Sequence, residues 1–208
     1  MRKWFIQFFG SLVPVALGVY LAVAVDDCKA TRALQERLDR VDEVLREEIL
    51  NNRQVVRTNL TYHVALRDSF LQSMRGLDES ALETRSARQL FRFWRGTRMQ
   101  GLQHGGYQAA LASGTLTEMP IIQLTNLSNL YNRQENYRGL GEQALRSVTQ
   151  LSPRSTLAEG AAFLGSFTVD AYYAETELLK AMDRVLENLG VPADTSYQPP
   201  PIHWRPDN

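Results

Sequence analysis

The feature that most constrains this chain is the stretch from Trp4 to Val25, WFIQFFGSLVPVALGVYLAVAV, which contains no charged residue. At ~1.5 Å per residue, a helix of this length crosses the roughly 30 Å hydrocarbon core of a bilayer. Pro14 lies within the stretch, and a membrane helix tolerates proline as a kink. The sequence therefore predicts a transmembrane anchor helix over residues 4–25.

A cleavable signal peptide is the alternative, because Arg2 and Lys3 give a basic start and Ala22-Val23-Ala24 fits a cleavage pattern. The apolar run is longer than the core of an ordinary signal peptide, so an uncleaved signal anchor is preferred. The residues expected to form the membrane anchor are Trp4, Phe5, Phe8, Phe9, Pro14, Gly18, Tyr20 and Ala22.

The charges on either side of the stretch predict its orientation. Arg2 and Lys3 precede it and Asp26 and Asp27 follow it, so the positive-inside rule places residues 1–3 in the cytoplasm. The remainder is then extracytoplasmic. The predicted location is a bacterial inner membrane, crossed once, with the bulk of the chain in the periplasm.

Composition limits the partners and cofactors. Lys and Arg together number 23, as do Asp and Glu, so the net charge is zero and a nucleic-acid partner is not expected. The single cysteine, Cys28, excludes an internal disulfide and a Cys-based zinc site. It is either a link between two copies or simply a small residue after the span. No cofactor or metal site is predicted.

Beyond the anchor, apolar residues recur every three or four positions, the period of one helical face. No Pro or Gly lies between Gly18 and Gly76, so one helix is expected to reach about Met74. The polar residues on its inner face suggest register control within a bundle or coiled coil: Asn52, Asn59 and His63. A hydrogen-bonded core histidine is favoured over a metal ligand for His63.

The rest of the chain predicts further helices separated by glycine and proline. The expected helices are a short one capped by Asp78 or Ser80 that runs through Ala81 and Leu90 to about Trp94, one over Tyr107–Ser113 closed by Gly114, one from Thr117 to Leu151, and one from Ser155 or Thr156 to Gly190 with Glu159 in a capping box. Aromatics and arginines alternate over residues 91–98, which indicates a helix end rather than a surface for nucleobases or lipid. The loop over residues 100–106 lacks the features of a phosphate loop, and His104 in it is a lone exposed imidazole.

The expected fold is therefore all-α, with four parts: a cytoplasmic terminus (1–3), the anchor (4–25), an extracytoplasmic helical bundle that begins with a long stalk helix (26–190), and an extended Pro-rich tail (191–208). The tail either docks a partner or lies on its own domain. Its candidate docking residues are Tyr197, Pro199, Pro200, Pro201, Trp204 and Arg205.

Two blocks carry a resemblance to known proteins. Leu17–Asp27 ends the apolar stretch with LGVYLAVAVDD, and Tyr107–Leu116 reads YQAALASGTL. Together they resemble a widespread bacterial family of short single-span proteins with no established activity, whose usual Trp after the acidic pair is replaced here by Cys28. The resemblance implies an anchored helical domain and supplies no site residues.

No catalytic motif is present: the sequence has no HExxH, GxSxG or Walker loop, and we do not expect an enzyme. The first hypothesis is a structural subunit that docks its bundle onto a larger membrane complex, for which a respiratory or photosynthetic assembly is conceivable. The alternative is an extracytoplasmic ligand-sensing bundle that acts through a partner. A third hypothesis is an enzyme with an unrecognised site, which a buried polar cluster lining a pocket between helices would favour. The expected partners are the lipid bilayer and other membrane subunits, and a homo-oligomer through the stalk helix is left open.

Overall fold

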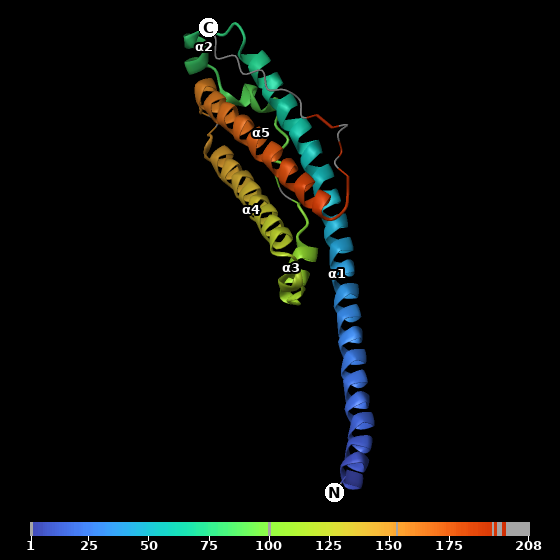
Figure 1. Ribbon diagram of the computed structural model, residues 1–208. Helices are drawn as coiled ribbons and strands as arrows, with labels where there is room; N and C mark the ends of the chain where they lie inside the picture. The colour runs from blue at the N-terminus through green and yellow to red at the C-terminus, as the bar shows by residue number, and fades with distance from the viewer. Residues whose placement is uncertain (1, 100, 153, 193, 195–196, 199–208) are drawn as a thin grey trace. The chain divides into compact units, whose positions relative to one another are not determined.

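The computed structural model describes residues 17–99, 101–152, 154–192, 194 and 197–198, together with the helical backbone of residues 2–16. These residues form helices and no strand, which confirms an all-α fold and a helical bundle. The chain divides into two compact units, Met1–Glu43 and Val44–Asn208. Within the second unit, α5 lies between α4 and the Val44–Met74 part of α1 (Figure 1).

Helix α1 spans Arg2–Met74 and ends where the sequence predicted. The next residues turn through Gly76, whose φ of 75° favours glycine. Among the described residues, no helix combines the length and the hydrophobicity that a membrane span requires. Most of the predicted anchor lies outside the residues whose side chains are described, including Trp4, Phe5, Phe8, Phe9 and Pro14.

The extension of a single helix to about Trp94 is wrong, whereas its predicted N-cap is confirmed, because the Asp78 carboxylate accepts the Ala81 N–H at 2.8 Å. Helix α2 covers only Glu79–Thr84, and the short 3-10 helices η1 (Ala87–Gln89) and η2 (Phe91–Phe93) follow it. The helix is interrupted after Thr84 because the backbone groups of Arg85 and Ala87 form hydrogen bonds with residues 155–157, which are distant in the sequence. The Leu157 N–H donates to the Arg85 carbonyl at 2.7 Å, and the Ala87 N–H donates to the Ser155 carbonyl at 3.0 Å. Tertiary pairing thus overrides the local helical pattern.

Helix α3 (Gly105–Ala112) is followed by Ser113 and Gly114, and the φ of 72° at Gly114 confirms the predicted left-handed residue after the helix. The 3-10 helix η3 (Thr115–Glu118) then precedes α4 (Ile121–Gln150), so the helix predicted from Thr117 begins later. Pro120 is the residue before α4, because its missing N–H prevents it from continuing the bonds of η3.

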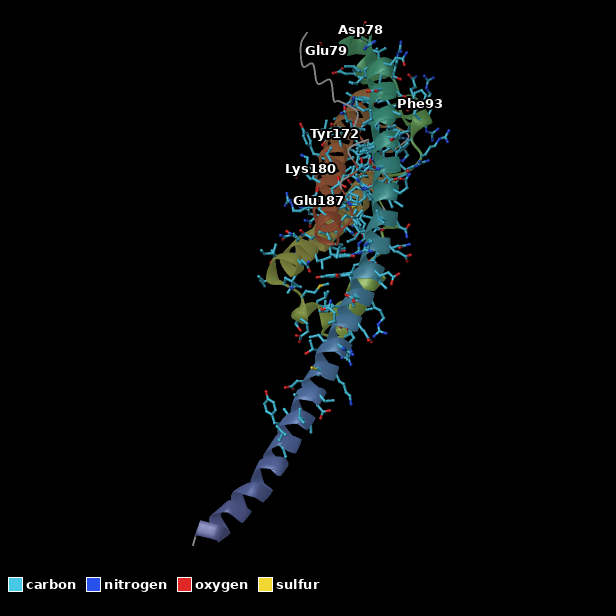
Figure 2. All side chains as sticks on the ribbon, turned by 45° about the vertical axis from the view of Figure 1, so that its right-hand side comes forward. Asp78, Glu79, Phe93, Tyr172, Lys180 and Glu187 are labelled. Carbon is cyan, nitrogen blue, oxygen red and sulfur yellow. The ribbon has the colours of Figure 1, made fainter. Side chains whose placement is uncertain are left out.

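Helix α5 (Leu157–Asn188) begins with the predicted capping box. The Thr156 hydroxyl accepts the Glu159 N–H, and the Glu159 carboxylate accepts the Thr156 N–H. Beyond the helix, Gly190 has a φ of 77°, as its position at the helix end predicts. Lys180 and Glu187 project from α5 into solvent (Figure 2), whereas its opposite face supplies Leu164, Leu178, Met182 and Leu186 to the core.

Candidate functional site

A stripe of polar side chains runs along the inner face of α1. Glu48, Asn52, Asn59 and His63 are each at most 6% exposed. Their spacing of four and seven residues keeps them on one side of the helix. This stripe faces the irregular segment between η2 and α3.

The stripe holds that segment by its backbone. The Asn52 side-chain amide donates to the Gln103 carbonyl and accepts the Gln103 N–H, both at 2.7 Å. The Asn59 amide donates to the Arg98 carbonyl at 2.5 Å. The Glu48 carboxylate accepts the Gly106 N–H at 2.6 Å. We refer to residues 97–99 and 101–106 as the clasped segment, because α1 supplies the groups that its backbone needs.

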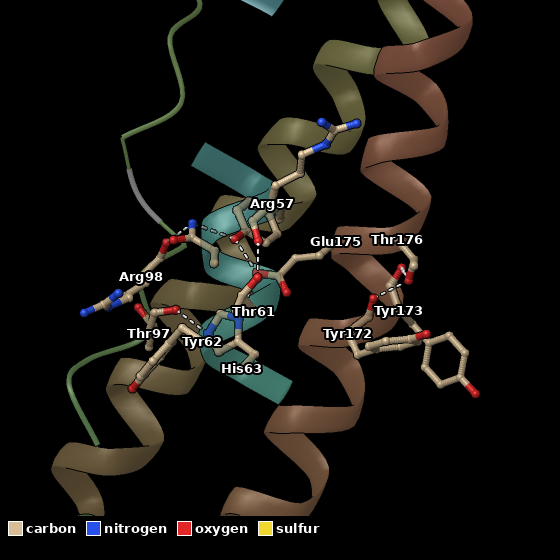
Figure 3. Close-up of polar contacts among 12 residues, drawn as sticks. Arg57, Thr61, Tyr62, His63, Thr97, Arg98, Tyr172, Tyr173, Glu175 and Thr176 are labelled. Carbon is tan, nitrogen blue, oxygen red and sulfur yellow. Dashed lines mark hydrogen bonds and ion pairs between the residues drawn. The ribbon is translucent and has the colours of Figure 1, made fainter. Parts of the chain in front are cut away.

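His63 lies at the centre of the most buried part of this network (Figure 3). Its Nε2 is 2.9 Å from the Thr97 carbonyl, and its Nδ1 is 2.7 Å from Oε1 of Glu175 on α5. Glu175 also accepts the Tyr137 hydroxyl of α4 at 2.8 Å. His63 and Glu175 are both fully buried, so this cluster joins α1, α4 and α5 in the interior.

The Thr97 carbonyl determines which ring nitrogen of His63 must carry a hydrogen. A carbonyl only accepts, so Nε2 carries a hydrogen. Nδ1 then either donates to a carboxylate or accepts from a protonated carboxyl, and the pair is neutral overall in both cases. Burial raises the pKa of Glu175, and the hydrogen bond from His63 opposes that rise. Since both ring nitrogens are occupied, this cluster fixes the fold rather than presenting a reactive imidazole.

The second hub is Glu48, which also accepts the Tyr131 hydroxyl at 2.5 Å. The ring of Tyr131 stacks on that of Tyr107, with centroids 4.0 Å apart and an interplanar angle of 12°. Burial raises the pKa of Tyr131, and the neighbouring Glu48 carboxylate raises it further. Tyr131 therefore remains a neutral hydrogen-bond donor to Glu48.

A pocket of about 490 Å³ opens between the clasped segment, α3 and α4, and we call it the tyrosine pocket. Its lining includes both stacked tyrosines, His104 and Gln134. Gln134 is only 6% exposed, and its Nε2 makes no hydrogen bond within the described part of the chain. A volume of this size and an aromatic wall beside a buried amide are typical of a small-molecule site.

A neighbouring side of α1 carries an ion-pair cluster. Arg53 lies 2.7 Å from Asp183 of α5, and Arg57 lies 2.7 Å from Asp194. The Arg57 guanidinium also covers the ring of Tyr197 at 4.2 Å from its centroid. Burial raises the pKa of Asp183, and Arg53 opposes this rise. The described start of the tail therefore packs on its own domain.

The structure places the sequence-predicted residues differently. Gly18, Tyr20 and Ala22 lie exposed on α1, and Tyr197 contacts Arg57. The other candidate docking residues of the tail lie outside the described residues: Pro199, Pro200, Pro201, Trp204 and Arg205. His63 is a hydrogen-bonded core histidine, as expected, and His104 is exposed at the tyrosine pocket. Within the described residues, no group of His, Cys, Asp and Glu is arranged to hold a metal ion.

Sequence reasoning missed Glu48, Glu175 and Gln134. The signal for Glu175 was present, because it occupies a core position of the helical period between Ala171 and Leu178. A charged residue at such a position is buried only when it is paired. Gln134 carried no comparable signal, since its burial depends on the irregular clasped segment.

Comparison with known proteins adds no assignment: no family model matches the chain, and no curated protein or solved structure matches it. The resemblance carried by Leu17–Asp27 and Tyr107–Leu116 therefore stays a prediction.

Proposed function

We propose that this chain is a non-catalytic subunit, anchored in a bacterial membrane by residues 4–25, whose helical bundle docks onto a larger membrane protein complex. The observation that supports the anchor is the exposure of apolar side chains along the last part of that stretch. Those at least half exposed are Leu17, Val19, Tyr20, Leu21, Val23 and Val25. Such a continuous apolar surface is favourable only against lipid or another protein.

Exposed apolar residues of the bundle support docking to a partner. Leu111, near the end of α3, is 56% exposed, and Ile121 and Ile122, at the start of α4, are 72% and 70% exposed. The short η3 helix joins these two ends. Large aliphatic side chains in this number at one connection are typical of a protein contact.

Membrane fractionation with alkaline carbonate washing tests the anchor. We expect the full chain to remain in the membrane pellet and the double variant Leu17→Arg/Leu21→Arg to be released, because an arginine near the centre of a span, as at position 17, costs about 2.5–3.5 kcal/mol and the one at position 21 adds a second charge. The matched control is Leu50→Arg, which alters a 37%-exposed leucine outside the anchor and is expected to stay in the pellet. Recovery of the unaltered chain in the soluble fraction would contradict the proposal.

The second candidate is a ligand-sensing bundle, and the tyrosine pocket favours it. Its test is a Gln134→Leu variant, which fills the same space but removes the buried amide. If the pocket binds a ligand through this amide, a cell extract that raises the melting temperature of the full chain will raise that of the variant less. An equal rise in both proteins would exclude this role for Gln134.

A further inference from the structure

A row of asparagines lies along one face of α4: Asn126, Asn129, Asn132 and Asn136. With Arg133, they line a hollow of about 480 Å³ whose other wall is Ala181 and Arg184 of α5. We call this hollow the asparagine groove. Ala181 is small, so the groove lies open between the larger polar side chains on either side.

The four amides have no structural use in the described part of the chain, where none of them makes a side-chain hydrogen bond. Asparagine is also among the less favourable residues for the interior of a helix. Four of them on one face, of which Asn126 is half-buried and the others exposed, therefore weaken α4 without a compensating hydrogen bond. Each amide offers both a donor and an acceptor to the groove, the combination that pairs with hydroxyl groups.

The charges lining the groove are positive. Arg133 has only a loose ion pair, 3.7 Å from Glu177, which also binds Lys180 at 2.8 Å. The hydrogen bond from Lys180 is the main cause of the lowered pKa of Glu177. Arg184 lowers this pKa as well, but only through a weaker, longer-range electrostatic interaction. Two guanidinium groups are thus available to an anion, and their planar fork suits phosphate or carboxylate oxygens.

An aromatic ring extends the groove. A second hollow of about 310 Å³ shares Arg133 and Asn136 with the first, and its other lining residues are Tyr137, Tyr173, Ala174 and Glu177. The Glu177 carboxylate is held by Lys180 and Arg133, so the acidic group of a ligand is expected at the Arg184 end of the groove. Tyr173 is 62% exposed and points away from the buried Glu175 cluster (Figure 3). An exposed ring beside amides and guanidinium groups offers an apolar face to the C–H side of a sugar ring.

We propose that the asparagine groove binds an anionic polyol ring, a sugar or a cyclitol, with its hydroxyl groups on the asparagine amides, its acidic group on Arg133 and Arg184, and its ring against Tyr173. Charge alone would need no amides, and hydroxyl groups alone would need no arginines. The groove volume suits one sugar ring and its acidic substituent. A soluble sugar phosphate and an inositol phospholipid headgroup share this chemistry.

The test is an NMR titration of the full chain, labelled with ¹⁵N at asparagine, in a mild nonionic detergent. Glucose 6-phosphate is the probe, and glucose and inorganic phosphate supply its two halves. We expect saturable shifts of the asparagine side-chain signals with glucose 6-phosphate at concentrations where neither half acts. Equal binding of inorganic phosphate would overturn the role of the amides, and the absence of any shift in all arms of the test would overturn the site.

Substitutions in the asparagine groove, with a control outside it, test whether the ligand binds there. Asn129→Ala/Asn136→Ala removes two hydrogen bonds and should weaken binding by at least about 10-fold, as should Arg184→Gln. The matched control is Asn51→Ala, an exposed helical asparagine of α1 outside the groove, which should bind normally. Because alanine favours a helix, the double variant should melt at or above the temperature of the unaltered chain. A lower melting temperature would show that the amides serve the fold and would contradict the proposal.

A parallel arm with phosphatidylinositol in mixed micelles distinguishes the two sources of the ligand. Shifts with the phospholipid and none with glucose 6-phosphate assign the groove to a lipid headgroup, and the reverse assigns it to a soluble sugar phosphate. Either result supports the binding of an anionic polyol ring. Because the chain in detergent does not depend on an intact bilayer anchor, failure of this test is separate from failure of the fractionation test.

Discussion

Removal of both members of the buried His63–Glu175 pair should destabilise the bundle much less than the sum of the two single removals. His63→Leu leaves Glu175 with the Tyr137 hydroxyl as its one remaining donor, since Oε2 of Glu175 has no partner among the described residues. Glu175→Leu leaves Nδ1 of His63 facing an apolar side chain. Each single change strands a polar group at a position that is fully buried.

The expected cost of each single change is about 3–5 kcal/mol, the range for breaking one side of a buried ion pair. For a chain of this size that corresponds to a fall of about 6–20 °C in melting temperature. In the double variant, the Thr97 carbonyl lacks its donor and the Tyr137 hydroxyl, which still accepts from Asn59, lacks an acceptor for its proton, at about 1–3 kcal/mol each. The double variant should therefore lose about 3 kcal/mol less unfolding free energy than the two single variants lose together, and this difference is the coupling energy.

The assay is urea unfolding of the full chain in detergent, followed by far-ultraviolet circular dichroism, for all four proteins of the cycle. Glu177→Leu serves as the matched control, because Glu177 is exposed on the same helix, and it should change the unfolding free energy by less than about 0.5 kcal/mol. Single effects that add within about 0.5 kcal/mol would mean that the two side chains do not interact, and would refute the reasoning.

Three further outcomes are expected. Burial raises the pKa of Glu175 above its ordinary 4.5, so the folded state keeps a proton that the unfolded chain releases. The free energy of unfolding of the unaltered chain, compared with that of Glu175→Gln in urea, should therefore fall as the pH rises above 4.5. A Cβ at Gly141 would lie 2.6 Å from Cβ of Met99, whereas one at Gly139 meets nothing within 4 Å; calorimetry should show that Gly141→Ala costs about 1–3 kcal/mol and Gly139→Ala gains about 1 kcal/mol. Asn52→Ala removes two hydrogen bonds at 2.7 Å, so it should cost about 1–3 kcal/mol in urea unfolding and speed amide exchange in the clasped segment.

The parts of the fold that the sequence predicted are those governed by local chemistry. Helix α1 runs to Met74 because no Gly or Pro interrupts it after Gly18, and α5 begins at a capping box that four residues specify. His63 was assigned to the core because it shares a helical face with leucines. In each case the deciding interactions lie within a few residues of the position that they explain.

The parts that the sequence did not predict depend on distant partners. Residues 85–87 leave the helical pattern because they pair with residues 155–157, and nothing near them in the sequence signals this contact. The asparagine groove is different, because its spacing along α4 was visible. It was missed because helical faces were identified by their apolar members alone, and a face of amides appears then only as a solvated side.

The polar stripe of α1 is a consequence of the irregular clasped segment. The carbonyls of Thr97, Arg98 and Gln103 need donors, and a helix cannot offer its own N–H groups because they are already bonded within it. Side-chain N–H groups are what remain, which is why His63, Asn59 and Asn52 occupy positions that would otherwise be apolar. Rotation of α1 by one residue, about 100°, would carry these side chains off the segment together. The position of α1 is therefore coupled to the wall of the tyrosine pocket that the clasped segment forms.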